Sequence, residues 1–148
     1  MQSIQAIIKH VDGFTVTGLA VRTQNSDEFN EKTAKLPQLW QQFYSSNLAT
    51  GTSVFGVYSD YESNENAPYT VTVGVTCENQ DPDFSTVKIS SGNYLVFRGV
   101  GTMPLAVIET WGRVWDYFTT ENLYQRCFIS DFEAYNGGDE VAIYIGIK

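Results

Sequence analysis

The sequence predicts an α+β fold in which two similar units, each a strand, a helix and two further strands, form one antiparallel sheet with two helices. The first observation is an aromatic segment at residues 39–43, because a similar segment recurs 75 positions later at residues 114–118. Apolar residues at helical spacing surround each segment, and two runs with strand-like alternation follow each one. A duplicated unit predicts two matching halves, and the boundary between them is a natural place for a ligand.

The length predicts a single domain over residues 1–148, since a chain of this size buries about 68–70% of its unfolded surface. The pseudo-repeats cover about residues 4–77 and 86–148. The acidic segment at residues 78–84 is the best candidate for the join between them.

The first half contains a strand region, a helix and two more strands. The helix has its apolar residues at i, i+3, i+4 and i+7, and Pro37 suits only its first turn. Its stripe consists of Leu36, Leu39, Trp40 and Phe43. The expected segments are strand at 4–23 with a turn or bulge at 12–13, a helix start at 26–28, and strands at 54–61 and 69–76.

The second half begins with a strand around residues 88–89 or residues 94–100, and the pattern leaves both open. Thr102 and Pro104 are typical of a helix start, because threonine caps helices and proline fits the first turn. The expected buried stripe of this helix consists of Ile108, Trp111, Trp115 and Phe118.

The C-terminal strands, residues 128–136 and 140–147, form a hairpin around residues 136–139. If Gly137 and Gly138 are the two loop residues, Glu133 lies opposite Ala142 and Asp131 lies opposite Tyr144. In this register Glu133 and Tyr144 share one face of the sheet.

Composition and charge exclude several classes of function. The formal net charge of −8 argues against a nucleic-acid partner, because an acidic surface repels phosphate. The single histidine, His10, lies outside any cluster of possible ligands, so we expect neither a metal site nor a cofactor. Cys77 and Cys127 are expected to be reduced thiols of a cytoplasmic protein. The sequence shows neither a signal segment, which would indicate secretion, nor an apolar run of ~18 residues, which would indicate a membrane span.

Several segments together resemble one known family. Residues 11–14 (VDGF), the strand at 18–23 (GLAVRT), the helix at 36–40 (LPQLW), the tryptophans of the second helix and the strand at 131–135 (DFEAY) are similar to the GyrI-like effector-binding domain. This domain is also the ligand-sensing part of AraC-type and BmrR-type multidrug-responsive regulators. Without a helix-turn-helix module, the chain is similar to the stand-alone members encoded on integron cassettes, and the resemblance does not imply transcription-factor activity.

The resemblance implies that the two units enclose an apolar, aromatic cavity. In the multidrug sensors an acidic residue on the matching strand recognises lipophilic cations, and the matching position here is Glu133. Tyr58 occupies the equivalent position of the first repeat, so we expect both side chains at the boundary between the halves. The alternative for Glu133 is an exposed carboxylate that is solvated or paired with a lysine.

The other candidates come from the aromatic residues. Trp40 and Trp115 occupy equivalent positions of the two repeats, and core packing is the main expectation for both, with a cavity position as the alternative. Trp111 matches Leu36 in the repeat, which favours a cavity position. Asp131 is expected near solvent. The candidate ligand-binding residues are Glu133, Tyr58, Trp111, Tyr144, Trp115 and Trp40, and we expect no catalytic and no metal-binding residues.

Three functional hypotheses remain open. The leading one is a binding protein for small amphipathic, aromatic cations. The second is a hydrolase with Glu133 as general base, which a Tyr58 or Tyr144 hydroxyl within hydrogen-bond reach would favour. The third is an acidic protein-interaction module, because the family name derives from a gyrase inhibitor. Binding is favoured over catalysis, since Glu133 has no orienting histidine or nucleophile nearby in the sequence.

Overall fold

The computed structural model describes residues 6–46, 53–63, 67–76, 84–120, 124–136 and 138–148. These residues form eight strands and three helices, and all eight strands belong to one antiparallel sheet. In chain order the elements are β1 (Ile7–Val11), β2 (Phe14–Thr23), α1 (Asn25–Glu28), α2 (Leu36–Tyr44), β3 (Ser53–Ser59), β4 (Tyr69–Val75), β5 (Ser85–Ile89), β6 (Gly92–Val100), α3 (Leu105–Thr120), β7 (Arg126–Asn136) and β8 (Glu140–Ile147).

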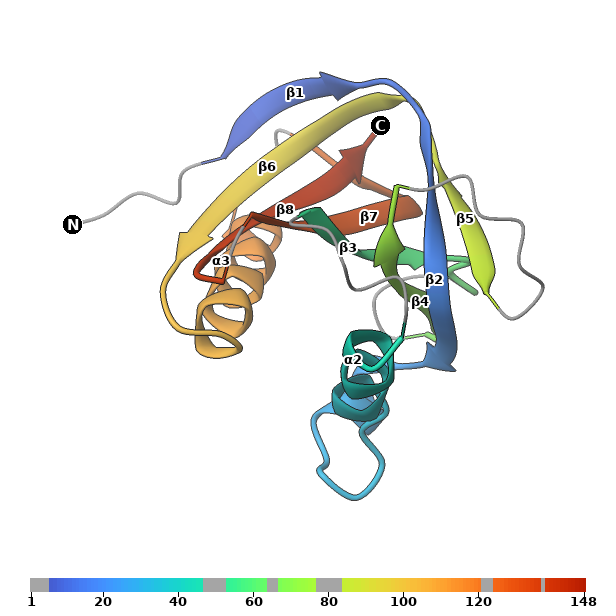
Figure 1. Cartoon of the computed structure of the whole chain (residues 1–148). Coiled ribbons are helices and arrows are strands. Elements are labelled where there is room, and N and C mark those ends of the chain that lie inside the picture. Colours follow the sequence, from blue (N-terminus) through green and yellow to red (C-terminus); the bar gives the residue numbers. More distant parts are fainter. Residues whose placement is uncertain (1–5, 47–52, 64–66, 77–83, 121–123, 137) are drawn as a thin grey trace.

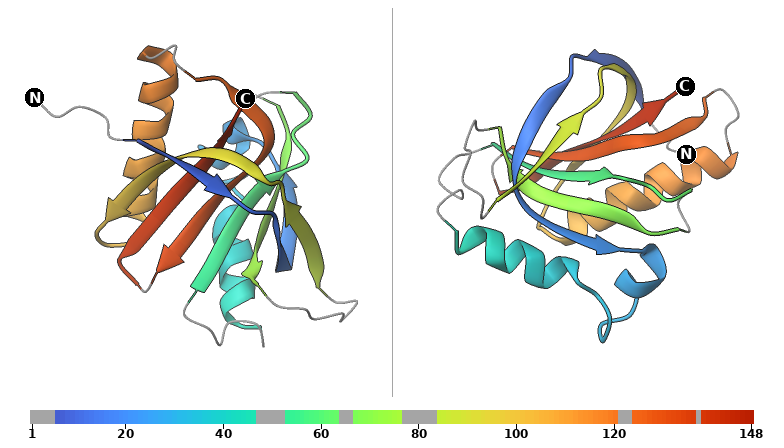
Figure 2. Two further views of the ribbon diagram at one scale, coloured as in Figure 1. Left: turned by 90° about the horizontal axis from the view of Figure 1, so that it is seen from above. Right: turned by 90° about the vertical axis from the view of Figure 1, so that its right-hand side faces the viewer.

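The sheet has the strand order β1-β6-β8-β7-β3-β4-β2-β5. Helices α2 and α3 cover the same face of it, with α2 against β2 and β4 and α3 against β6 and β8 (Figures 1 and 2). The predicted α+β class and antiparallel sheet are therefore confirmed. The short helix α1, at the predicted helix start, is additional to the two helices expected.

The strand order is symmetric about the central pair, β7 and β3. On one side the sheet continues through β8 to β6, and on the other side it continues through β4 to β2. The outer strands are exchanged, because β1 pairs with β6 of the second half and β5 pairs with β2 of the first half. The pseudo-repeats at about 4–77 and 86–148 remain our proposal for the origin of this symmetry.

The predicted elements of the first half are confirmed with shifts of one or two residues at their ends, except that the first strand, predicted from residue 4, begins at Ile7, and residues 4–5 lie outside the described residues. In the second half both alternatives are strands, since β5 contains residues 88–89 and β6 contains residues 94–100. Cys127 is a free thiol. Cys77 and the predicted join at residues 78–84, except Phe84, lie outside the described residues.

The face of α3 that packs on the sheet is not the predicted one. Ile108 is 58% exposed and Trp115 is 38% exposed, so the predicted buried stripe does not face the core. Trp111 and Phe118, the other two residues of that stripe, are only partly buried. The buried positions of the helix are Ala106, Thr110, Val114 and Tyr117.

A close approach between α3 and β6 explains why small residues take this face. A Cβ atom at Gly99 of β6 would lie only 2.0 Å from the hydroxyl oxygen of Thr110. Thr110 satisfies that buried hydroxyl by donating to the carbonyl of Ala106 at 2.7 Å. Ile108 and Trp115 lie on the more exposed side of the helix, whereas Tyr117, the large residue of the buried face, packs on Phe97 of β6.

Strands β7 and β8 form the predicted hairpin, but the predicted register is wrong by one residue. β7 ends at Asn136 and β8 begins at Glu140, so three residues separate the strands instead of two. Because a shift of one residue moves every side chain to the other face, Tyr144 does not share a face with Glu133. The observed pairs are Glu133 with Ile143, Asp131 with Ile145 and Phe132 with Tyr144, in place of Glu133 with Ala142 and Asp131 with Tyr144.

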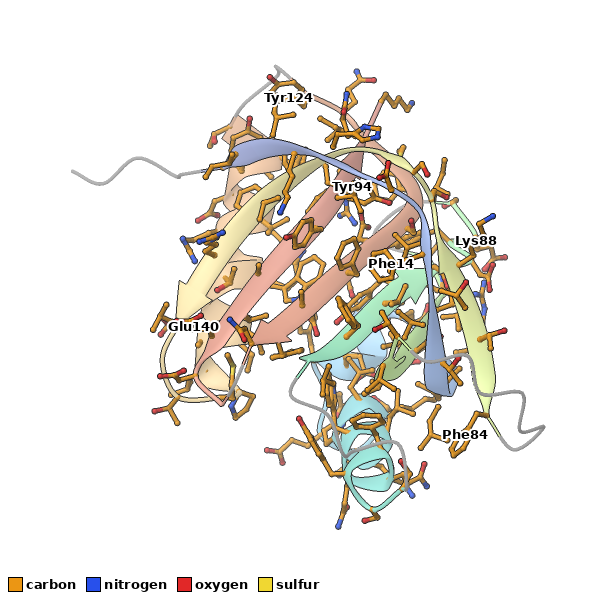
Figure 3. All side chains as sticks on the ribbon, turned by 45° about the horizontal axis from the view of Figure 1, so that its top comes forward. Phe14, Phe84, Lys88, Tyr94, Tyr124 and Glu140 are labelled. Atoms are coloured by element: carbon orange, nitrogen blue, oxygen red, sulfur yellow. The ribbon has the colours of Figure 1, made fainter. Side chains whose placement is uncertain are left out.

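The sheet face away from the helices has an aromatic core of its own. Phe132 and Tyr144 stack there with their ring centroids 4.4 Å apart and their planes at 8°. Phe14 of β2 and Tyr94 of β6, both labelled in Figure 3, pack against Phe132 with centroid distances of 5.5 Å. Tyr144 is thus held in this second core.

The close approach of β2 and β4 gives a test of the sheet. Gly18 pairs with Gly74, and a Cβ atom at Gly18 would lie 1.9 Å from the carbonyl oxygen of Val73. We expect Gly18→Ala to lower the free energy of unfolding by about 1–3 kcal/mol, because the backbone must move to admit the methyl group. Urea denaturation measures the change.

Gly112→Ala is the matched control for this substitution. A Cβ atom at Gly112 would have no neighbour within 4 Å, and alanine favours a helix interior over glycine by about 1 kcal/mol. Gly112→Ala should therefore leave stability unchanged or raise it. Equal destabilisation by the two variants would contradict the close approach of β2 and β4.

Candidate ligand-binding site

A cavity of about 550 Å³ lies on the helix-covered side of the sheet. Its volume falls within the range of about 300–1,000 Å³ that is typical of small-molecule sites. Its walls come from α1, α2 and α3 and from β3, β4 and β7, so both halves contribute. All three tryptophans of the chain line it. The aromatic lining residues are Phe29, Trp40, Tyr58, Tyr61, Tyr69, Trp111, Trp115 and Tyr135.

Glu133 of β7 places a carboxylate in the wall of this cavity. The residue is only 4% exposed, so the predicted alternative of a solvated strand carboxylate is wrong. Trp111 donates its indole N–H to Oε2 of Glu133 at 2.6 Å, and Tyr58 donates its hydroxyl to the same oxygen at 3.0 Å. Tyr135 donates to Oε1 at 2.8 Å. Among the described residues, Glu133 has no ion-pair partner.

Burial raises the pKa of Glu133 above the ordinary value of 4.5, although the three hydrogen bonds act in the opposite direction. Burial, followed by the nearby charge of Glu133, also raises the pKa of Tyr58 and the pKa of Tyr135. Both hydroxyls therefore stay protonated near neutral pH and can only donate to the carboxylate. The result is an anion held in position by neutral groups.

Gly56 makes room for this carboxylate. It lies opposite Glu133 on β3, and a Cβ atom there would come within 2.7 Å of Oε1 of Glu133 and 3.3 Å of the Trp40 ring. Gly56 was not among the residues predicted from the sequence. A glycine inside a strand often marks a close approach of this kind, so the sequence did contain a signal.

The predicted aromatic residues have different positions. Tyr58 and Trp111 contact Glu133 and line the cavity, and their role in ligand binding stays a prediction. Trp40 packs against Tyr135 with a centroid distance of 5.2 Å, so it contributes both to the cavity wall and to the buried cluster around Leu39 and Phe43 of α2. Trp115 lines the cavity and is partly exposed, which corrects the expectation of core packing. Tyr144 lies on the other face.

Asp131 is completely buried, which corrects the expectation that it lies near solvent. It forms an ion pair with Arg126 at 2.7 Å, accepts the backbone N–H of Gly146 at 2.8 Å and accepts the hydroxyl of Tyr61. Arg126 and Asp131 flank an irregularity in the pairing of β7 with β8. Arg126 also lines the cavity, and its positive charge is neutralised there by Asp131.

Glu28, at the end of α1, is a second cavity carboxylate that sequence reasoning missed. Its oxygens accept the backbone N–H groups of Lys35 and Leu36 at 3.0–3.2 Å and the hydroxyl of Thr23 at 2.5 Å. It therefore caps the N-terminus of α2 from outside the helix. Acidic residues at a helix start are common, and nothing in the sequence distinguishes this one.

Neither a metal site nor a membrane span is found in the part of the chain that the structure describes. No group of three histidine, cysteine, aspartate or glutamate side chains there could hold a metal ion. No helix there is long and apolar enough to cross a bilayer.

Comparison with known proteins identifies the family. The family model of Cass2, the integron-associated effector binding proteins, matches residues 7–147. The chain belongs to this family. The resemblance to effector-binding domains that the sequence motifs indicate is thereby confirmed.

Individual relatives of this Cass2-family chain cover nearly all of it. The integron cassette protein VCH_CASS2, from the mobile metagenome of Vibrio cholerae, is 36% identical in sequence, with a TM-score of 0.91 over 97% of this chain and 95% of that chain. YobU of Bacillus subtilis (strain 168) is 30% identical over 158 residues, which are 95% of this chain and 96% of YobU. The structure of SAV2435 bound to tetraphenylphosphonium has the same fold, with a TM-score of 0.76 and 18% identity over 97% of this chain and 94% of that chain.

The buried ion pair beside the cavity should be important for stability. We expect Asp131→Asn to lower the free energy of unfolding by about 3–5 kcal/mol, because Arg126 keeps a buried charge without its counter-ion. Thermal or urea denaturation measures the loss. Asp12→Asn is the control, since the side chain of Asp12 is 98% exposed and its removal should have little effect. If Asp131→Asn lowers the free energy of unfolding no more than Asp12→Asn does, the ion pair of Asp131 with Arg126 is unimportant for stability.

Proposed function

We propose that the protein binds lipophilic, aromatic cations in this cavity, with Glu133 as the counter-charge. The observation that carries the proposal is a buried carboxylate in an aromatic wall, held by three neutral donors. A permanent organic cation supplies the missing positive charge without needing strong hydrogen bonds. The bound tetraphenylphosphonium of SAV2435 supports the same class of ligand, since that protein shares the fold.

The aromatic lining suits such a ligand. A cation within about 6 Å of a tryptophan or tyrosine face gains roughly 0.5–2 kcal/mol, and more rings can stack on flat parts of the ligand. Trp111 and Trp115 lie side by side on α3, with ring centroids 6.2 Å apart. Trp40 stacks on Tyr44, with a centroid distance of 6.0 Å and an interplanar angle of 27°. Aromatic rings from both halves are thus available to a ligand beside Glu133.

Two probes of nearly the same size and shape test the role of charge. We expect tetraphenylphosphonium to bind and tetraphenylborate, its anionic counterpart, not to bind. Glu133→Gln should weaken tetraphenylphosphonium binding by about 10- to 100-fold, because two unit charges about 6–10 Å apart at an effective dielectric constant of about 20 attract each other by roughly 1.5–3 kcal/mol. Isothermal titration calorimetry gives the affinity, and the fluorescence of the three cavity tryptophans gives an independent signal.

Glu140→Gln is the matched control, because Glu140 is an exposed carboxylate at the start of β8. It should leave the affinity within about twofold of the unmodified protein, as expected for a surface substitution remote from the cavity. Equal binding of the two probes, or equal affinities of Glu133→Gln and Glu140→Gln, would contradict the proposal.

Cation affinity should depend on pH because only the ionised carboxylate attracts the ligand. The pKa of Glu133 lies above 4.5, so the affinity should rise as the pH increases through this raised value and then level off. In the ligand-free protein the same shift has the opposite effect on stability. Ionising the buried group costs free energy, so the contribution of Glu133 to stability falls over this pH range.

Titrations between pH 4 and 8 measure both effects, with Glu133→Gln as the reference that lacks them. The difference in unfolding free energy between the two proteins should change in favour of Glu133→Gln as the pH rises. If the two proteins show the same pH dependence, titratable groups other than Glu133 are responsible for it.

Hydrolysis with Glu133 as general base is a second candidate. The hydroxyl that this hypothesis requires is present, since Tyr58 lies 3.0 Å from Glu133, whereas Tyr144 faces away. A carboxylate has about four acceptor positions, and three are occupied, which leaves one for a water molecule. The described cavity lining contains no serine, cysteine or histidine. We expect the protein to hydrolyse p-nitrophenyl acetate and styrene oxide no faster than buffer does. A faster rate that Glu133→Gln abolishes would instead favour the hydrolase hypothesis.

A further inference from the structure

The cavity has a second acidic position, and the proposed function does not use it. Glu28 of α1 and Glu133 of β7 both line the cavity, although they are far apart in the sequence and come from different halves. Each carboxylate is held by neutral donors, Glu28 by two backbone N–H groups and a hydroxyl, and Glu133 by an indole and two phenols. Neither has an ion-pair partner among the residues that the structure describes.

The cavity therefore carries an excess of negative charge. The basic residue in its lining, Arg126, is paired with Asp131 at 2.7 Å and cannot neutralise a further acid. The lining therefore supplies no positive charge that neutralises Glu28 or Glu133. A single cation can compensate only one of them.

A pair of tyrosine rings connects the two acids. Tyr58 donates to Glu133, and its ring lies 5.4 Å from the ring of Tyr69. Tyr69 donates to Asn25 at 2.6 Å, and Asn25 and Glu28 belong to the same helical turn. The charges of Glu28 and Glu133, after burial, both raise the pKa of Tyr69, which agrees with a position between them. An apolar surface of two rings thus separates two anionic positions.

From this arrangement we infer that the cavity takes elongated dications, in which an apolar spacer joins two cationic groups, one placed at Glu133 and the other at Glu28. The inference rests on the proposed function and specifies its substrate class. The spacer lies against Tyr58 and Tyr69, which offer apolar faces rather than hydrogen bonds. A ligand of this kind neutralises both carboxylates, whereas a monocation leaves the acid of Glu28 uncompensated.

Polymethylene bis(trimethylammonium) ions with four to twelve methylene groups test the inference, each compared with the alkyltrimethylammonium ion of the same chain length. Two-point binding predicts that one spacer length binds best. At that length the dication should bind about 3- to 10-fold more tightly than its monocation, as expected for one added, partly exposed ion pair. An affinity without an optimum, or equal to that of the monocations, overturns the inference.

Glu28→Gln assigns the second position. It should reduce the ratio of dication to monocation affinity to about one, and because both affinities are measured in the same variant, a loss common to the two ligands cancels. Asp27→Asn is the matched control, because it removes the neighbouring acid of α1, which does not line the cavity. A dication advantage that survives Glu28→Gln, or that Asp27→Asn removes equally, contradicts the assignment to Glu28.

The outcomes separate the two proposals. If tetraphenylphosphonium does not bind, the proposed function itself fails. If it binds but dications gain nothing at any spacer length, the proposed function stands and the second position is rejected. Should Glu28→Gln fail to fold because α2 loses its cap, the spacer-length series on the unmodified protein still decides, because it requires no variant.

Discussion

The hydrogen-bonded carboxylate of Glu133 is the interaction on which the rest of the cavity depends. Its donors come from α3, from β3 and from β7 itself, so one charged group ties together three elements that border the cavity. A buried charge is costly unless other donors replace the lost water. Here an indole and two phenols replace it and leave the charge in place. The wall thus combines a fixed anion with rings that shield it from solvent.

The symmetric strand order explains where this anion lies. Tyr58 and Glu133 are 75 positions apart, occupy equivalent places in the proposed repeats and are hydrogen-bonded to each other across the central strands. Two glutamates at these positions would repel each other, and two tyrosines would provide no charge. A tyrosine on one side and a glutamate on the other make a donor and an acceptor. The departure from symmetry is therefore what allows a single charge to be buried at the symmetric centre.

Alternation and apolar spacing were sufficient to predict the fold class and most of the elements, whereas the meeting of Tyr58, Trp111 and Glu133 was expected from the repeat alignment and the family resemblance. They failed on α3, because apolar periodicity shows which residues avoid water and does not distinguish a core from a cavity wall. They failed on Tyr144 because one additional loop residue reverses every side chain of β8. Glu28 could not be predicted, since its position depends on how α1 packs beside α2 and not on any local pattern.

Because the outer strands are exchanged, each half depends on the other half for its edge strand. The N-terminal strand β1 completes the edge of the second half, and β5 completes the edge of the first. If the chain were cut between the two halves, the first fragment would lose β5 and the second fragment would lose β1. The cut would also expose the unpaired edges of β3 and β7. Neither fragment is a self-sufficient folding unit on this topology. The cavity is consequently a property of the joined pair, because residues of both halves form its walls.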